Sequence, residues 1–137
     1  MRQDRNGAPC RMGNVVQIVP RETVRIDHEP LARLYAALGT QGAEDVIARA
    51  VEDIAHRLAR IETDHRDLAF DRLERGARMV AAVAAPIGLG DLSRVSAHVA
   101  ACALRNDAAA LGATVARLAR LGRRAMTDFG RMRQSGG

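Results

Sequence analysis

The chain contains no lysine and no tryptophan, so its 21 basic residues are all arginine. Without lysine, Schiff-base chemistry and any lysine-centred phosphate site are excluded. The only aromatic residues are Tyr35, Phe70 and Phe129. The hydrophobic residues make up 47% of the chain and are mostly alanine, valine, leucine and isoleucine. This composition favours close-packed helices over a sheet rich in aromatic residues, and we expect an all-α protein.

Cysteine and long apolar runs are also scarce. Cys10 and Cys102 are too few for a disulfide framework or a zinc site, and Cys102 falls on an apolar helical stripe, where a free thiol packs as a small hydrophobe. No apolar segment typical of a signal peptide occurs near the start, and no apolar run approaches the roughly 20 residues that cross a bilayer. We therefore expect a cytoplasmic protein with no membrane partner, no metal and no cofactor.

The net charge of +5 is concentrated at the two ends of the chain. Residues 1–28 carry +2 and residues 105–137 carry +5, whereas the segment between them carries −2. A length of 137 residues fits one domain. We expect a flexible arm over residues 1–25, a helical bundle over 26–129 and a disordered tail over 130–137.

Apolar residues recur at helical spacing in five segments. Asp27 is the expected N-cap of a short helix that stops at Gly39, and a second helix is expected to begin near Glu44. Asp67 is the expected cap of a third helix, which the turn Pro86–Gly90 ends. The inward residues of the second and third helices are expected to be Ile47, Ala50, Val51, Ile54, Leu58, Ile61, Phe70, Leu73, Ala77, Val80 and Ala84.

A fourth helix is expected from Asp91, and a fifth from Asn106 or Asp107, despite Gly112 and Gly122 in its interior. Their inward residues are expected to be Leu92, Val95, Val99, Ala103, Leu111, Val115, Leu118, Ala125 and Phe129. Helices joined by short loops favour antiparallel neighbours. The sequence therefore predicts an antiparallel up-and-down four-helix bundle with a short additional N-terminal helix.

Several short patterns along this predicted bundle belong to one family. They are Asp27, Leu31 and Leu34 in the first helix, Phe70 and Leu73 in the third, Ile87-Gly88 in the turn, and Arg105-Asn106-Asp107 before the last helix. With these patterns, the segment from Ile26 to Met126 resembles the histidine-phosphotransfer (Hpt) family. The likeness is spread over about a hundred residues, with no single strong motif.

The resemblance implies that the family's phosphate chemistry is absent here. Counting back from Ile87-Gly88 puts Arg78 at the position of the phospho-accepting histidine. Ala81 falls at the position of the lysine that neutralises the phosphate, and Ala82 at the glycine that permits close approach. A guanidinium stays protonated at physiological pH and is no phosphoryl nucleophile. We therefore expect no catalysis at this position, and no enzyme.

An apolar strip beside Arg78 indicates a contact surface. The segment from Met79 to Pro86 has no polar residue, so the outward side of the third helix is apolar and is edged by charge. The strip consists of Arg75, Arg78, Met79, Ala82 and Ala85. In the family this face meets a receiver domain, so the resemblance implies a receiver domain or a histidine kinase as partner, with Arg78 on the receiver carboxylate. The alternative is that Arg78 is simply solvated.

Two further hypotheses remain open. His56 is an alternative phosphoryl acceptor, although Glu52 and Arg60 one turn away also fit an ordinary surface histidine. The remaining histidines, His28, His65 and His98, show no spacing typical of a metal site or a catalytic dyad.

Arginines also form one stripe on the fifth helix. Its members are Arg117, Arg120, Arg124 and, if the helix continues, Arg131. The stripe could bind a polyanion. Cations near a helix C-terminus explain it without a ligand, and this explanation is favoured because no aromatic residue lies nearby for base stacking. We do not expect nucleic-acid binding.

Overall fold

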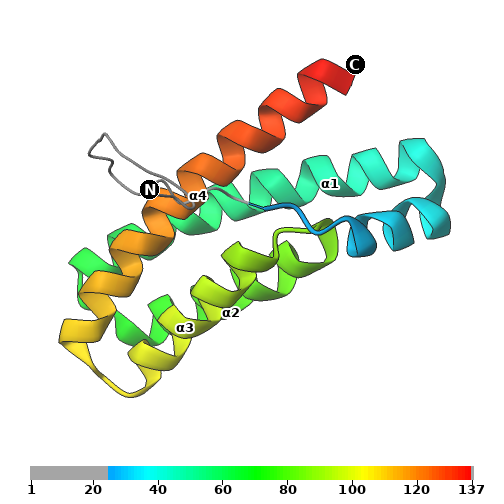
Figure 1. Cartoon of the computed structure of the whole chain (residues 1–137). Coiled ribbons are helices and arrows are strands. Elements are labelled where there is room, and N and C mark those ends of the chain that lie inside the picture. The colour runs from blue at the N-terminus through cyan, green and yellow to red at the C-terminus, as the bar shows by residue number, and fades with distance from the viewer. Residues whose placement is uncertain (1–24, 137) are drawn as a thin grey trace, which may run out of the picture.

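The computed structural model describes residues 25–136, and this part of the chain is all-helical (Figure 1). It contains four α-helices and one short 3₁₀ helix. They are α1 (His28–Arg66), α2 (Phe70–Ala84), η1 (Ala85–Ile87), α3 (Gly90–Leu104) and α4 (Ala108–Gly136). The all-α prediction is confirmed for these residues. The run Val15–Val19, whose valines and isoleucine favour a short strand, and the predicted arm up to residue 24 lie outside them.

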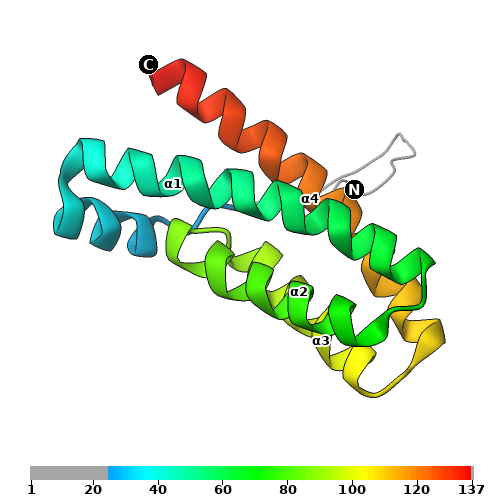
Figure 2. The ribbon, with the colours of Figure 1, turned by 180° about the vertical axis from the view of Figure 1, so that it is seen from behind.

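α1 reverses direction at Gly39, whose φ of 73° and ψ of 173° are non-helical. Such a backbone conformation is open to glycine and strained for other residues. Figures 1 and 2 both show the short segment before Gly39 running back alongside the long segment after it. The predicted stop at Gly39 is confirmed. The second segment resumes directly after Gly39, not near Glu44, because this one residue makes the reversal.

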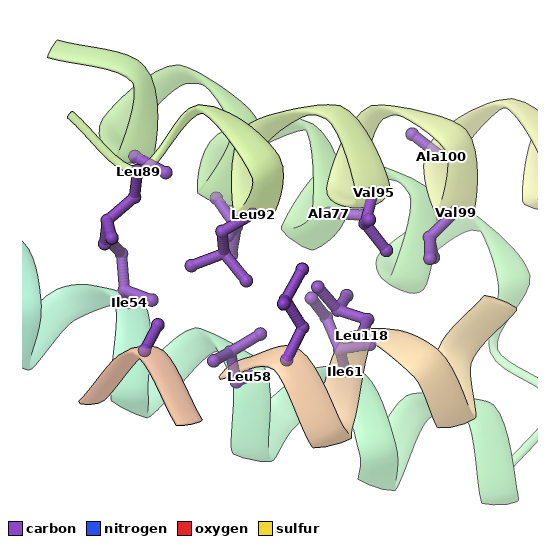
Figure 3. Packing of buried hydrophobic residues seen from close by; sticks show 14 of the residues in the cluster. Ile54, Leu58, Ile61, Ala77, Leu89, Leu92, Val95, Val99, Ala100 and Leu118 are labelled. Carbon is purple, nitrogen blue, oxygen red and sulfur yellow. The ribbon is translucent and has the colours of Figure 1, made fainter. Parts of the chain in front are cut away.

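Each helix packs against the next one along the chain, and α4 also packs against α1 (Figures 1 and 2). The core fills the space between them, with Ile54, Leu58 and Ile61 of α1 facing residues of α3 and α4 (Figure 3). The predicted inward residues are buried, except that Ala50, Val51 and Phe70 are partly buried against the core. Burying aliphatic side chains in this way stabilises the fold by about 1.5–3 kcal/mol for each large residue.

α1, α2 and α3 begin without a side-chain cap hydrogen bond, whereas α4 has one. Asp107 caps α4 as predicted, since the Ala110 N–H donates to its Oδ1 at 3.1 Å. Asp67 does not cap the third predicted helix. It ends α1 instead, where its N–H donates to the Thr63 carbonyl at 2.9 Å, and α2 begins three residues later at Phe70.

The turn between η1 and α3 holds the start of α1. The Asp27 N–H donates to the Gly88 carbonyl at 2.8 Å. Asp27 precedes α1 as predicted, but its side chain makes no cap hydrogen bond and lies against Gly90 instead. α3 begins at Gly90, one residue before the predicted Asp91. This contact ties the chain ahead of α1 to the junction of α2 and α3.

α4 is helical to Gly136, which corrects the prediction of a structureless tail from residue 130. The residues after Gly130, which are Arg131 to Gln134, are good helix formers. Among the described residues, no helix combines the length and the apolar character needed to span a bilayer.

Candidate docking site on α2

An exposed apolar strip with arginines at its edge runs along α2 and into η1. Successive turns of the helix bring these positions to one side. All five predicted contact residues are exposed, namely Arg75, Arg78, Met79, Ala82 and Ala85. Met79 is 45% exposed, which is high for a large apolar side chain, whereas Val80 and Ala84 on the opposite side are fully buried. α2 therefore buries one apolar face in the core and exposes a second apolar stripe to solvent.

Arg78 is not a free charge on this strip. Its guanidinium donates from Nη2 to the Glu74 carboxylate one turn earlier in α2. The Glu74 side chain is only 12% exposed, while that of Arg78 is 68% exposed. Among the described residues, Arg75 has no ion-pair partner. The unpaired charge on the strip is therefore that of Arg75, a residue that sequence reasoning treated as secondary.

α3 supports the strip from behind. The Ser93 hydroxyl donates to the Ala81 carbonyl at 2.8 Å, which adds a polar contact to the apolar packing of α2 on α3. Ala81 is half-buried, and Ala82 is exposed. The strip is thus presented by a helix that is fixed on its inner side.

An open hollow of about 320 Å³ lies between α1 and α2, next to the strip. Four arginines, one histidine and one carboxylate line it together with apolar groups, which make up most of its surface. The lining residues are His56, Arg57, Arg60, Ile61 and Asp64 of α1, and Arg72, Arg75, Gly76 and Met79 of α2. Arg75 and Met79 belong to both the strip and the hollow. The two features therefore form one continuous surface.

Two of the four arginines in the hollow are held by carboxylates. Arg57 Nε donates to both oxygens of Asp53 at 3.0 Å, within α1. Arg72 Nε lies 3.3 Å from Asp64 Oδ1, which links α2 to α1. Arg60 and Arg75 have no ion pair within the part of the chain that the structure describes. The hollow therefore has one unpaired guanidinium on each of its two helices.

Sequence reasoning missed the hollow because it depends on how α1 and α2 pack together. In the sequence, the arginines of the hollow stand on two separate predicted helices. Sequence reasoning did identify His56, which is exposed and lines the hollow. The structure thus brings His56 into the same hollow as Arg75 and Met79, which no sequence pattern grouped with it.

The other predicted candidates lie elsewhere. His28 and His98 are exposed and His65 is half-buried, and the described residues contain no group of potential metal ligands. On α4, Arg117 and Arg120 are exposed and Arg124 is half-buried. The side chain of Arg131 lies outside the described residues. Cys102 is buried as a free thiol.

No protein-family model, no curated protein and no solved structure matches this chain. The candidate site is therefore defined by its own geometry.

Proposed function

We propose that the chain is a non-catalytic interaction module, similar to a histidine-phosphotransfer domain, that docks a receiver domain or a histidine kinase of a two-component pathway in the cytoplasm. The observation that carries this proposal is the exposed strip on α2, with Met79 45% exposed among small apolar residues and Arg75 unpaired at its edge. Exposed apolar patches edged by charge are typical of protein interfaces.

The arrangement of the helices supports the bundle on which this proposal rests. Each helix packs on its neighbour in sequence and α4 returns to α1, as in an antiparallel up-and-down four-helix bundle. In that arrangement, the segment before Gly39 is the additional short helix. The strip then lies on the third helical segment, where the family docks its receiver.

The chemistry of Arg78 argues for docking without phosphate transfer. A protonated guanidinium has no lone pair to attack phosphorus, so no phosphoryl group is carried at this position. Arg78 binds Glu74 in the free protein. A receiver carboxylate would meet Arg75 directly and would compete with Glu74 for Arg78. Arg75 is therefore the first electrostatic contact in this proposal.

His56 supports a second candidate, an active phosphotransfer protein with a displaced acceptor. Its imidazole is exposed and lines a hollow that holds four arginines. An imidazole nitrogen there would attack the phosphorus of a receiver's aspartyl phosphate, the aspartate carboxylate would leave, and guanidinium groups would neutralise the phosphoryl oxygens. Acid-labile phosphate that is lost in His56→Ala would establish this candidate in place of the first.

The docking proposal is tested with a charge placed on the strip. Ala82→Glu puts a carboxylate into the apolar contact, where burial without a partner is costly. The purified receiver domains and histidine kinases encoded in the same genome are titrated against the wild type and the variant. We expect one of them to bind the wild type, and Ala82→Glu to abolish that binding. Since Ala82 is exposed, the free energy of unfolding should change by about 0.5 kcal/mol or less.

Ala116→Glu is the matched control, because Ala116 is exposed on α4, which has no contact with α2 among the described residues. It should leave binding unchanged. Loss of binding in Ala116→Glu but not in Ala82→Glu would show that the interface lies on the arginine stripe of α4 and not on α2. Unfolding of Ala82→Glu would show that the strip is core and that the proposed interface does not exist.

A further inference from the structure

The hollow between α1 and α2 has an excess of positive charge, of which the docking proposal uses only Arg75. Four guanidinium groups line it, against the single lining carboxylate of Asp64. Asp64 is 6% exposed and is already engaged by Arg72 at 3.3 Å. It therefore cannot neutralise the other arginines. The excess charge is that of Arg60 on α1 and Arg75 on α2, since neither has an ion pair among the described residues.

The shape of the hollow fits a ligand larger than a water molecule. Its volume of about 320 Å³ lies at the lower end of the range of small-molecule sites. Ile61, which is 1% exposed, Gly76 and Met79 provide apolar lining between the charged groups. Gly76 has no side chain to fill the space, and a methyl group there would lie 3.4 Å from Ile61 Cγ1. The hollow thus combines charged groups with a mainly apolar lining.

We propose that this hollow binds a dianionic phosphate group, held between Arg60 of α1 and Arg75 of α2. A carboxylate has two oxygens and is matched by one guanidinium, whereas a phosphate monoester has three terminal oxygens and nearly two negative charges. It can therefore accept hydrogen bonds from two guanidinium groups at once. The remaining space and the apolar lining receive the organic group that carries the phosphate. No phenylalanine, tyrosine or tryptophan lines the hollow, so the group that it recognises is the phosphate and not a stacked base.

The test uses the full chain and inorganic phosphate as the first probe, at constant ionic strength set with sodium chloride. We expect saturable binding at one site, measured by chemical-shift changes of the His56 and Met79 side chains. Arg60→Gln and Arg75→Gln should each weaken binding by roughly tenfold or more, since each removes a charge-assisted hydrogen bond. Both side chains are exposed, so the variants should unfold at the wild-type temperature.

Two matched variants separate a defined site from general attraction of anions. Arg120→Gln removes the same charge from an exposed position on α4 and should leave the affinity unchanged. Asp64→Asn removes the lining carboxylate and should tighten binding several-fold, a direction that loss of structure would not produce. Equal weakening by Arg120→Gln and Arg60→Gln would overturn the proposal. So would the absence of saturable binding.

Two further probes identify the source of the phosphate. Adenosine monophosphate represents a free metabolite, and a phosphoserine peptide represents a modified partner protein. Tighter binding of either one than of inorganic phosphate supports the site and assigns its source. Arg75 belongs to both the strip and the hollow, whereas Arg60 lines the hollow alone, so Arg60 separates the two proposals. Arg60→Gln should weaken phosphate binding by roughly tenfold or more and leave receiver binding in place, whereas Ala82→Glu should abolish receiver binding and leave phosphate binding in place.

Discussion

Gly88 connects the start of α1 to the junction of α2 and α3. Its φ of 88° is in the left-handed region, and its carbonyl accepts the Asp27 N–H at 2.8 Å. A Cβ at this position would lie 2.6 Å from the Asp27 carbonyl oxygen and 3.2 Å from Ile26 Cγ2. The first of these is backbone and cannot move aside without breaking the contact. Both the backbone conformation and the available space therefore require glycine here.

We predict that Gly88→Ala lowers the free energy of unfolding by about 2 kcal/mol or more. The left-handed conformation costs about 1–2 kcal/mol for a residue with a Cβ, and the overlap with Asp27 adds to this cost. Urea denaturation measures the change. Gly130→Ala, with no atom within 4 Å of the added Cβ, is the control and should not destabilise the chain. Equal stability of the two variants would show that the start of α1 is not held at Gly88.

If the proposed likeness to histidine-phosphotransfer domains holds, Arg78 is the residue that keeps the strip from carrying phosphate. Arg78→His restores an acceptor imidazole but leaves Ala81 and Ala82 at the positions of the lysine and the glycine. We predict that phosphorylation of this variant by a phosphorylated receiver domain is absent or very slow, because no charge neutralises the phosphoryl group and the Ala82 methyl crowds the approach. Radiolabel transfer measures it, with Arg78→Ala as the background. Rapid labelling of Arg78→His would show that the two neighbouring positions matter little.

Two of the internal glycines of α4, Gly112 and Gly122, have different surroundings. A Cβ at Gly112 would meet no atom within 4 Å, whereas a Cβ at Gly122 would lie 2.5 Å from Leu58 Cδ1 of α1. Gly122 is buried, and Leu58 is 8% exposed. α4 therefore approaches α1 closely at Gly122, and this is where glycine has a structural role. Gly112 has no such role in the described contacts.

We predict that Gly112→Ala raises the free energy of unfolding by about 0.5–1 kcal/mol, the usual gain from replacing glycine in a helix interior. Gly122→Ala has the same helical gain but displaces Leu58, and overpacking costs about 1–3 kcal/mol. It should therefore be less stable than Gly112→Ala by at least about 1 kcal/mol. Thermal and urea unfolding of both variants give the comparison. Equal stabilisation would mean that α4 does not pack closely on α1.

Helical periodicity predicted the elements and their buried faces, because burial of an apolar stripe depends mainly on spacing within one helix. The contacts between helices were not predictable in this way. Sequence reasoning counted Gly122 only as a cost to α4, while the structure shows that it faces Leu58. It assigned a cap to Asp67, which ends α1 instead. The exposed strip was found from α2 alone, whereas the hollow needed the register of α1 against α2.

At the scale of the whole molecule, the candidate surfaces share one side of the α1–α2 pair. Arg75 and Met79 line the hollow and also belong to the strip, so a protein docked on the strip would border the hollow. The core behind this surface is continuous from α1 to α4. A charge on the strip should therefore alter binding without unfolding the chain. This separation between a stable core and an exposed surface is the basis of the proposed function.

The central claim is that the chain binds a receiver domain or a histidine kinase without accepting phosphate. The most direct measurement mixes the chain with a radiolabelled, phosphorylated receiver domain and follows complex formation and label in the same sample. The account predicts that the chain elutes with the receiver and remains unlabelled. Acid-labile label on the chain that disappears in His56→Ala would contradict it.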